Sequence, residues 1–534
     1  MLLTLLPVSS LEKVFSDSDI SAYKKSDFLP LLCGEKGAVQ FAVSADEDCV
    51  LPFEIKCPLE YKAYTVKEIY SDTSRENSVK NCTMLNNGRE GFYPDLMCPI
   101  EGDTLTLKKD NLLCVRIELE GNIPGDHTVI FTLGENLAVV NIHVSAVALP
   151  EQTLICTNWF HTDCLMTWYK IDAFSEEYWR IVENYVRNAV AHGINMILTP
   201  LFTPPLDTEV GAERPTVQLV GVKRIQYGYA FDFTNFDRWV DMCLRCGVKY
   251  FELSHLFTQW GAKFAPKIIA RTSTGDRQIF GWDNYSLSQG YKSFLRQFGQ
   301  SLKEHTDSLG ITDICRIHAS DEPSKSSIRH YRCISAIMRE YFPAFKHIDA
   351  LSDYEFYEEG LVDIPVPSES AVESFKGKVD ELWTYYCCGP YENEYPNRFL
   401  FLPLIKMRII GVLLWKYNCR GFLHWGFNFW YAQLSKRAVN PFENTTADGN
   451  FPAGDGFIVY PGENGEPMTT IREKAFYAGV CDYTALQALE NKAGRPAAEE
   501  LLKRTLGDIT FTSYPLEAEK FEEFRRELIN AMDK

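Results

Sequence analysis

Two adjacent carboxylates near the middle of the chain, Asp321 and Glu322, carry the clearest chemical signal in the sequence. They follow a short apolar run typical of a buried strand, and Pro323 ends that strand and opens a helix. Two neighbouring acids repel when both are ionised, so one should keep its proton towards neutral pH and serve as a general acid. The plainer interpretation is that Asp321 caps the following helix and Glu322 stabilises its N-terminus.

Glycoside cleavage is one chemistry that such a pair could serve. The usual retaining and inverting mechanisms need two acids on opposite sides of the scissile bond. The apolar run 382–386 has no acid at its carboxyl end, whereas Asp349 and Asp353, at the end of another run, remain possible partners. A pair without an opposed nucleophile favours a substrate-assisted route, in which the 2-acetamido oxygen of the sugar attacks its own anomeric carbon.

Aromatic side chains crowd the segment 421–431. Aromatic rings can stack on the apolar faces of sugars, so we expect Trp425 and Trp430 to bind substrate. The phenylalanines of this segment are expected to pack in the core. Trp159 and His161 end an earlier apolar run in the same way, and His161 is a possible hydroxyl ligand, although a lone histidine is more often structural.

Alternating strands and helices surround these residues from position 151 onward. Eight apolar runs, with amphipathic helices between most of them, predict a (β/α)8 barrel over residues 151–494, in which Asp321 and Glu322 close the fourth strand at the catalytic rim. An open doubly wound sheet is the alternative, but no Gly-rich phosphate loop follows any run. The expected strands are 154–160, 195–201, 249–254, 314–319, 346–351, 362–366, 382–386 and 421–425. The expected helices are 176–192, 234–246, 289–308, 324–342, 403–417 and 471–494.

The two ends of the chain differ from this central part. Residues 1–150 hold short alternating or apolar runs separated by Gly, Asn and Asp turns, which predicts an antiparallel β-sandwich domain. Residues 495–534 are charged and helical, and we expect this segment to pack on the outside of the barrel. The predicted fold is therefore α/β, a barrel preceded by a sandwich.

Charge and cysteine content narrow the possible partners. The formal net charge of -18 repels phosphate backbones and anionic lipids, so neither nucleic acid nor a membrane surface is an expected partner, and a neutral carbohydrate fits better. No apolar stretch predicts a transmembrane helix, and the N-terminus is a poor secretion signal. The 16 cysteines are scattered through apolar segments, which favours free thiols and a cytoplasmic protein.

Metal and serine-hydrolase chemistry lack support in the sequence. Cys243 and Cys246 form one CxxC inside a helical pattern without a second pair, and Cys387 and Cys388 lack a histidine at ligand spacing. The chain has no His-Glu-x-x-His, phosphate-binding loop or Gly-x-Ser-x-Gly motif. We therefore expect no metal and no cofactor.

Several motifs in order resemble the catalytic domain of glycoside hydrolase family 123, the β-N-acetylgalactosaminidases, over about residues 155–490. The sandwich-like N-terminal region is also similar to the architecture of that family. The motifs are Asp321-Glu322-Pro323, the segments 383–390 (WTYYCCGP), 396–398 (PNR) and 421–426 (GFLHWG), the helix through Gly411 and Trp415, and the loop 454–462 (GDGFIVYPG).

The resemblance implies a retaining exo-glycosidase that acts on terminal β-linked 2-acetamido sugars through an oxazoline. Glu322 would then be the general acid and later the base, Asp321 would orient the acetamido group and stabilise its developing charge, and Tyr385 would hold the acetamido carbonyl. Asn397 is expected among the substrate-binding residues. Two alternatives stay open: a conventional glycosidase with Asp349 or Asp353 as nucleophile, and a carbohydrate-binding protein without turnover.

Overall fold

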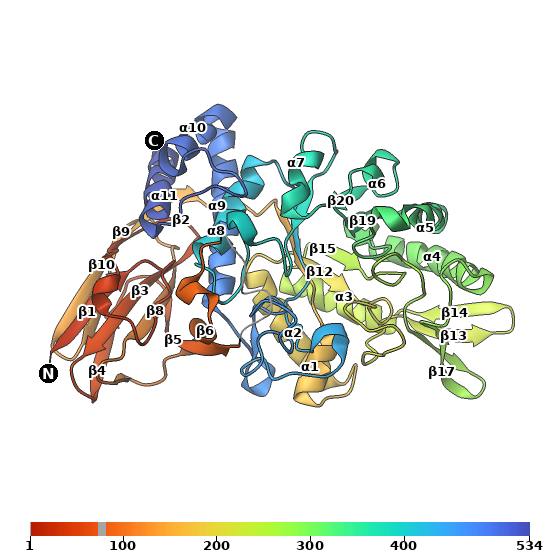
Figure 1. Ribbon diagram of the computed structural model, residues 1–534, viewed down its shortest axis with the longest axis horizontal. Coiled ribbons are helices and arrows are strands. Elements are labelled where there is room, and N and C mark those ends of the chain that lie inside the picture. Colours follow the sequence, from red (N-terminus) through yellow and green to blue (C-terminus); the bar gives the residue numbers. More distant parts are fainter. Residues whose placement is uncertain (1, 73–81) are drawn as a thin grey trace.

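The computed structural model describes residues 2–72 and 82–534. A β-sandwich built from the N-terminal strands stands beside a parallel β/α barrel, and a long helix, α9 (Ile471–Ala493), runs between them (Figure 1). The C-terminal helices lie next to the sandwich, so the two ends of the chain are on the same side of the molecule.

The sandwich consists of two five-stranded sheets with the orders β1-β3-β8-β5-β6 and β2-β10-β9-β4-β7. The strands pair antiparallel, as the sequence predicts, with one exception: β2 and β10 are parallel. The inner faces meet in an apolar core in which the rings of Phe41 and Phe131 lie 5.0 Å apart. The strands are β1 (Leu3–Val8), β2 (Phe28–Cys33), β3 (Lys36–Ala45), β4 (Cys49–Lys56), β5 (Tyr61–Ser71), β6 (Gly91–Pro99), β7 (Thr104–Leu107), β8 (Leu113–Glu120), β9 (Gly125–Leu133) and β10 (Asn136–Ala148).

The barrel is an eight-stranded parallel sheet in the order β20-β19-β18-β15-β12-β11-β22-β21. The first strand thus lies beside the last, and the remaining gap is bridged by the backbone N–H of Tyr385, which donates to the carbonyl of Pro367 at 3.0 Å. All eight predicted strands are confirmed, each at or within its expected bounds. They are β11 (Ile155–Asn158), β12 (Met196–Thr199), β15 (Tyr250–Leu253), β18 (Cys315–Ile317), β19 (Lys346–Ala350), β20 (Ile364–Val366), β21 (Trp383–Tyr385) and β22 (Gly421–His424).

Alternate residues of the barrel strands fill its interior. Ile155, Met196, Ile348 and Trp383 contribute to one apolar cluster inside the barrel. Gly421 is required beside that cluster, because a Cβ there would lie 2.1 Å from the Trp383 ring. Because side chains point alternately into and out of the barrel along each strand, this alternation also determines which polar side chains face the interior near the carboxyl rim.

Helices join most of the strands, as predicted, but two connections hold only four-residue helices, α6 and α7. Ser175, Ser288 and Thr470 cap α2, α4 and α9 by accepting a hydrogen bond from a first-turn N–H. The helices are α1 (Thr162–Tyr169), α2 (Glu176–Ala191), α3 (Thr234–Cys246), α4 (Gln289–Leu309), α5 (Ile328–Tyr341), α6 (Glu355–Glu358), α7 (Val372–Phe375) and α8 (Ile405–Lys416), followed by α9. Single 3-10 turns are η1 (Ile20–Ala22), η2 (Leu85–Gly88), η3 (Thr312–Ile314), η4 (Lys325–Ser327), η5 (Glu369–Ala371), η6 (Glu392–Glu394), η7 (Gln433–Ser435) and η8 (Glu463–Gly465).

Helix α8 departs from the predicted amphipathic pattern, because almost all its side chains are buried between the barrel and α9. The two helices approach so closely that a Cβ on Gly411 would lie 1.7 Å from the carbonyl oxygen of Gly479. Even Lys406 is fully buried, where it forms an ion pair with Glu394. A helix covered on all sides needs no polar stripe.

The C-terminal helices are α10 (Arg495–Leu506) and α11 (Ala518–Asp533). Helix α11 packs against α9 and also against β2 and β10 of the sandwich. Arg525 of α11 pairs with Glu35 of the sandwich at 2.5 Å, and both side chains are buried. The segment 495–534, predicted to pack on the barrel, thus also packs on the sandwich. The domain boundaries at 150 and 494 stay a prediction.

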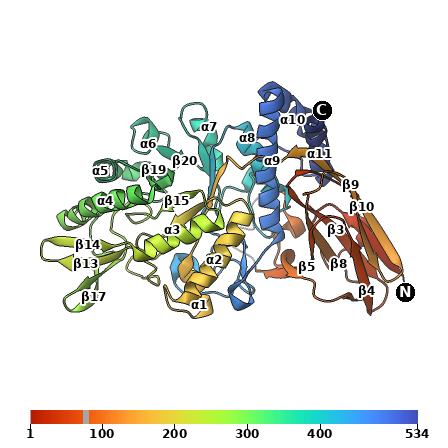
Figure 2. The same cartoon turned by 180° about the vertical axis from the view of Figure 1, so that it is seen from behind.

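A small four-stranded sheet, absent from the predicted strands, projects from the barrel at the end far from the sandwich (Figures 1 and 2). It contains β13 (Gly221–Ile225), β14 (Gly228–Asp232), β16 (Ile268–Thr272) and β17 (Gly275–Phe280). A two-stranded ribbon, β23 (Tyr460–Pro461) with β24 (Pro467–Met468), precedes α9.

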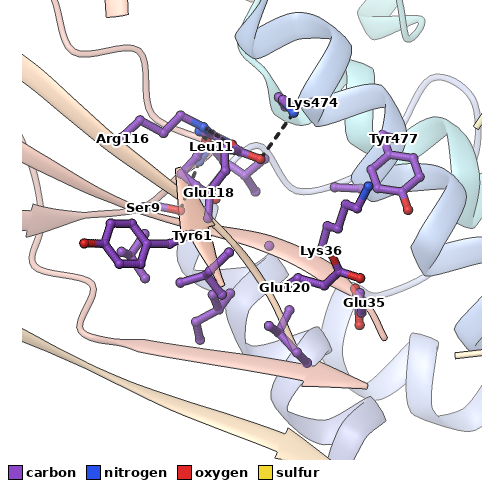
Figure 3. Close-up of a pocket in the computed structure, with 18 of the residues that line it drawn as sticks. Ser9, Leu11, Glu35, Lys36, Tyr61, Arg116, Glu118, Glu120, Lys474 and Tyr477 are labelled. Carbon is purple, nitrogen blue, oxygen red and sulfur yellow. Dashed lines mark hydrogen bonds and ion pairs between the residues drawn. The ribbon is translucent and has the colours of Figure 1, made fainter. Parts of the chain in front are cut away.

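A cavity of about 580 Å³ lies between the sandwich and α9 (Figure 3). Its charged lining is largely paired within the protein: Glu118 accepts from Arg116 at 2.6 Å and lies 3.5 Å from Lys474. Neither member of the Asp321–Glu322 pair lines this cavity. It therefore belongs to the contact between the two domains and not to the predicted catalytic rim.

Candidate active site

Asp321 and Glu322 lie beyond the carboxyl end of β18 and are fixed from both sides. The backbone carbonyl of Asp321 accepts from the N–H of Trp260, after β15, at 2.8 Å. The N–H of Glu322 donates to the carbonyl of Ala350, at the end of β19, at 3.0 Å. Because β15 and β19 flank β18 in the sheet, the pair is held between its two neighbouring strands.

The backbone of Glu322 has a φ of +44°. A residue with a Cβ adopts this left-handed conformation only when the surrounding structure imposes it, and such strain gathers at functional sites. Glu322 is exposed, whereas Asp321 is half-buried. The two neighbouring acids therefore have different surroundings.

The capping interpretation of Asp321 is wrong. The 3-10 turn η4 follows Ser324 and helix α5 follows Ser327, so these serines hold the positions before the two helical segments. Asp321 lies too far upstream to accept from the first N–H groups of α5. Asp321 lies instead at the carboxyl rim of the barrel, beyond the end of β18.

The surroundings of Asp321 disfavour its charged form. Burial raises its pKa well above the ordinary value, and the charges of Glu322, Asp349 and Glu252 add to that rise. The charge of His318 opposes it.

Tyr385, at the end of β21, reaches the pair from across the barrel. Its hydroxyl donates to Oε1 of Glu322 at 2.5 Å, and burial together with the Glu322 charge raises the pKa of the phenol, which keeps it a donor. Tyr386 points to the other face, where its ring packs on Phe422 and His424. The predicted strand register is confirmed: Tyr385 points into the barrel, and Tyr386 packs on the opposite face of the sheet.

A buried ionic cluster lies below the rim. His318, on the segment that leads to Asp321, donates to Glu252 Oε1 at 2.6 Å and to Asp349 Oδ1 at 3.1 Å. Burial alone lowers the pKa of His318, but these two carboxylates raise it to about 9. Glu252 also accepts from Thr157 and from the indole N–H of Trp159, so the cluster links three more barrel strands to β18.

Asp349 is fully engaged by the scaffold. Besides His318, it accepts from the N–H groups of Ala319 and Ser320 and from the hydroxyl of Tyr331. A carboxylate that is 1% exposed and bonded on both oxygens is poorly suited to attack a sugar. Asp353 lies outside the cluster, 3.7 Å from Lys325. Asp349 is thus held as part of the scaffold below the rim.

The predicted sugar-binding tryptophans differ in exposure. Trp425 is half-buried, and its indole N–H donates to Asp455 at 3.0 Å, which fixes the ring near the end of β22. Trp430 and Trp159 are each only 2% exposed, and Trp430 packs edge to face on Trp168. Trp425 is therefore the one of the three that is only half-buried, while the other two are parts of the core.

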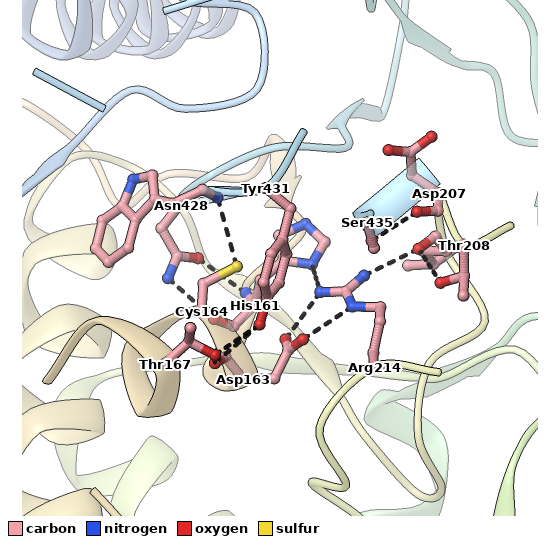
Figure 4. Close-up of polar contacts among 12 residues, drawn as sticks. His161, Asp163, Cys164, Thr167, Asp207, Thr208, Arg214, Asn428, Tyr431 and Ser435 are labelled. Carbon is pink, nitrogen blue, oxygen red and sulfur yellow. Dashed lines mark hydrogen bonds and ion pairs between the residues drawn. The ribbon is translucent and has the colours of Figure 1, made fainter. Parts of the chain in front are cut away.

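His161 and Asn397 are occupied within the protein. Asn397 is fully buried and donates to the carbonyls of Cys387 and Pro390, so it shapes the loop after Tyr385. His161 accepts from Arg214 at Nδ1 (Figure 4) and contacts the Trp425 carbonyl with Nε2. Burial and the charge of Arg214 lower the pKa of His161 to about 3, so its ring is neutral.

Arg214 carries no signal in the sequence that marks it as functional. It is buried and pairs with Asp163 through two hydrogen bonds of 2.8 Å (Figure 4). Its guanidinium group lies over the rings of Phe429 and Tyr431. Its loop therefore docks on the aromatic segment after β22. No local pattern identifies such a residue, since its partners come from distant parts of the chain.

Glu252, His318 and Trp260 are likewise absent from the residues that the sequence predicts for the site. A lone acid inside an apolar strand is the signal that could have indicated Glu252, and His318 stands only three positions before Asp321. Trp260 belongs to the loop 256–288, which joins the loop 203–235 in one wall: the Asp207 N–H donates to Gln259 and the Trp282 indole to Ala212. This wall reaches Asp321 through the backbone of Trp260.

Among residues 2–72 and 82–534, no three His, Cys, Asp or Glu side chains gather in a way that could hold a metal ion. Nor does any helix in these ranges have the length and apolar character needed to cross a membrane. All 16 cysteines lie in the described ranges and none forms a disulfide.

The sequence profile of the glycoside hydrolase 123 catalytic domain matches residues 159–489. Among solved structures, a family 123 glycoside hydrolase from Clostridium perfringens, described for glycolipid glycan hydrolysis, aligns with 100% of this chain and 98% of its own at 17% identity and a TM-score of 0.76. A putative β-galactosidase from Bacteroides fragilis aligns with 85% of this chain and 59% of its own at 10% identity and a TM-score of 0.34, too low to carry any argument. No curated protein matches the sequence.

Proposed function

Because the chain belongs to glycoside hydrolase family 123, we propose that it is a retaining exo-glycosidase that removes terminal β-linked 2-acetamido sugars, with N-acetylgalactosamine favoured. The observation that carries this proposal is the contact of Tyr385 with Glu322 beside Asp321 at the carboxyl rim. It brings a hydrogen-bond donor and two acids to one place. Asp349, the nearest candidate for a conventional nucleophile, is meanwhile held by the scaffold.

In the first step, Glu322 donates a proton to the glycosidic oxygen as the bond to the anomeric carbon breaks. The acetamido oxygen of the same sugar attacks that carbon and closes an oxazoline ring. An internal nucleophile that is already positioned can have an effective molarity of about 10⁵ M or more. No protein nucleophile is then needed.

Asp321 would orient the acetamido N–H and stabilise the positive charge that develops on it. The pKa of Asp321 is raised in the free protein, and a cation that forms next to this carboxyl group lowers it again, because a positive charge favours the ionised form. Tyr385 would turn its hydroxyl from Glu322 to the acetamido carbonyl. Glu322, freed of that hydrogen bond, then takes a proton from the water that opens the oxazoline.

The fixed position of the pair supports this assignment. The backbone of Asp321 is bonded to the loop that follows β15, and the backbone of Glu322 is bonded to the end of β19, so the backbone of the pair is held at the rim from both sides. Preorganised groups of this kind avoid the cost of reorganisation in the transition state.

The free cysteines support a reducing compartment such as the cytoplasm as the place of action.

The experiment that tests the proposal compares two aryl glycosides that differ only at C2. The protein should cleave an aryl 2-acetamido-2-deoxy-β-galactoside much faster than the plain aryl β-galactoside, because only the first carries the internal nucleophile. Release of the β-anomer, followed by NMR during the first turnovers, should show retention. Equal rates on both sugars would contradict substrate assistance, and binding without turnover would indicate a carbohydrate-binding protein.

A further inference from the structure

The segment that carries Tyr385 continues into two adjacent cysteines, Cys387 and Cys388, to which the proposed function gives no role. Their sulfur atoms lie 3.8 Å apart, and both residues are free thiols that are only partly buried. Strand β21 ends at Tyr385, so the two thiols follow that strand at the carboxyl rim of the barrel. They form a dithiol two residues beyond the phenol that contacts Glu322.

The loop that carries this dithiol is tied to the barrel. The N–H of Cys387 donates to the carbonyl of Gly389 at 3.0 Å. The side chain of Asn397 donates to the carbonyls of Cys387 and Pro390 at 2.9 and 3.1 Å. Cys387 also packs against the apolar cluster inside the barrel to which Tyr385 belongs. A change in the backbone of Cys387 is therefore transmitted to the end of the strand that holds Tyr385.

The surroundings of the two thiols assign them different parts in an exchange reaction. The contact with Cys388 and loss of hydration raise the pKa of the Cys387 thiol, and the charges of Glu322 and Asp455 add to that rise. The effect of Glu322 places the Cys387 sulfur in the electric field of the proposed acid. Since the thiolate is the nucleophile and a carboxylate disfavours it, the first attack on an oxidant falls to Cys388.

A disulfide between neighbouring residues is a strained bond. Adjacent Cα atoms are about 3.8 Å apart, less than the roughly 4.4–6.8 Å that disulfides usually span. The bonded sulfurs would also have to approach to about 2.05 Å, so the backbone between Cys387 and Cys388 must twist. A strained and partly exposed disulfide is readily reduced by thiols, which suits a reversible modification and not a permanent cross-link.

We propose that Cys387 and Cys388 are a modification site, which a low-molecular-weight disulfide closes to a vicinal disulfide, and that closure lowers activity by drawing Tyr385 away from Glu322. The inference goes beyond the proposed function and relies on it only for the roles of Tyr385 and Glu322. Their hydroxyl–carboxyl contact of 2.5 Å tolerates little displacement. In a reducing compartment the site stays open and the enzyme stays active.

The reaction is a thiol–disulfide exchange in two steps, with glutathione disulfide as the oxidant. The Cys388 thiolate attacks one sulfur of the oxidant, which forms a mixed disulfide and releases one glutathione thiolate. Cys387 then loses its proton, and its sulfur attacks that of Cys388 and displaces the second glutathione thiolate. The two protons from the cysteines end on the two released thiolates. Two electrons thus pass to the oxidant, and the protein loses two hydrogen atoms.

Peptide mapping of the full-length parent tests whether the bond forms. The protein is equilibrated with glutathione disulfide, its remaining thiols are blocked with iodoacetamide, and it is digested with trypsin. Trypsin releases the segment 379–398, which contains Cys387 and Cys388 and no other cysteine. This peptide should be two hydrogen atoms lighter than its reduced form, and a thiol reductant should reverse the change. A peptide with both cysteines alkylated, or with glutathione on each, would overturn the proposal.

Activity on an aryl 2-acetamido-2-deoxy-β-galactoside tests the consequence. Closure should lower the kcat of the parent roughly ten- to a hundredfold, because a displacement of about 1 Å at a catalytic group can cost about 10²-fold. The double variant Cys387→Ser, Cys388→Ser should keep the rate of the reduced parent in both buffers. Cys333→Ser removes an exposed thiol on α5 and should respond to the oxidant as the parent does. Thermal unfolding checks that each variant is folded.

Two results of this comparison would overturn the proposal. One is an unchanged kcat in a parent whose peptide is bridged. The other is an equal loss of activity in the folded double variant, because cysteines elsewhere would then be responsible.

Failure of the proposed function gives a different result. A reduced parent that does not cleave the glycoside would contradict that function and not this site. The N–H of Tyr385, which donates to the Pro367 carbonyl across the gap in the barrel, then provides the second measurement. Its hydrogen exchange should become faster when the disulfide closes, because the strand end moves. An unchanged exchange rate in the bridged protein would overturn the proposal.

Discussion

The hydroxyl of Tyr385 and the carboxyl group of Glu322 are 2.5 Å apart, so the seventh strand of the barrel contacts the acid that follows the fourth. The sequence led us to expect that Tyr385 holds the acetamido carbonyl, and this contact adds a second role. It holds Glu322 until a substrate takes its place.

Glu322→Gln should leave the fold intact and lower turnover of natural-type glycosides by roughly 10²- to 10⁴-fold, the usual contribution of a positioned general acid. Tyr385 can still donate to the amide oxygen, so the local structure has no reason to change. Steady-state kinetics and thermal unfolding measure both effects. Substrates with a very acidic leaving group should lose least, and a variant at the parent rate on an alkyl or sugar glycoside would exclude Glu322 as the acid.

Asp321→Asn should reduce cleavage of acetamido sugars more than it weakens binding, because the developing oxazolinium charge loses its partner. The raised pKa of Asp321 also gives the pH dependence a direction. If ionised Asp321 is needed, activity falls as the pH drops through that raised pKa, above the ordinary range near 4. A pH profile of kcat/KM for the parent checks this, and an acid limb at or below pH 4 would contradict it.

Tyr385→Phe should lower kcat more than it raises KM, since the hydroxyl positions the acetamido carbonyl and Glu322 rather than the sugar ring. Tyr386→Phe is the matched control. The Tyr386 hydroxyl is buried and has no hydrogen-bond partner within the described chain, so its removal should leave activity unchanged and stability equal or higher. Kinetics and unfolding of both variants decide the assignment, and loss of activity in Tyr386→Phe alone would reverse it.

His318 gives the stability of the fold a pH dependence. Its pKa rises from 6.5 to about 9 in the folded protein, so its contribution is complete below pH 6.5 and is lost as the pH rises through about 9. Melting temperatures of the parent and of His318→Gln between pH 6 and pH 9.5 isolate this contribution from other titrating groups. The stability difference between the two proteins should shrink with rising pH; a constant difference would show that His318 is not charged in the fold.

Arg214→Met should destabilise the protein by about 3–5 kcal/mol, since it leaves Asp163 buried without its cation. The pair of Arg271 and Asp276, exposed on the β16–β17 hairpin, is the control. Arg271→Met should leave the stability almost unchanged, because water screens such an exposed pair. Denaturant unfolding of both variants measures the contrast, and equal small losses would mean that the Arg214 loop is not held by this ion pair.

The sequence by itself determined the eight strands, the sandwich that precedes them and the place of Asp321 and Glu322 at the rim. Each of these follows from a local signal: an apolar run, a change of periodicity, or an acid directly after a strand. The alternation of side chains along a strand also assigns Tyr385 and Tyr386 to opposite faces of the sheet. Local patterns suffice where a property depends on a few neighbouring residues.

Only the tertiary structure decided which of the expected side chains stay available to a ligand. His161 and Asn397 have residue types suited to binding, but their polar atoms are bonded to partners elsewhere in the fold. Trp430 is buried by the same kind of tertiary packing, whereas Trp260, in a loop without a recognisable motif, is left in solvent beside Asp321. Burial and hydrogen-bond partners depend on contacts between distant segments, and no local pattern contains them.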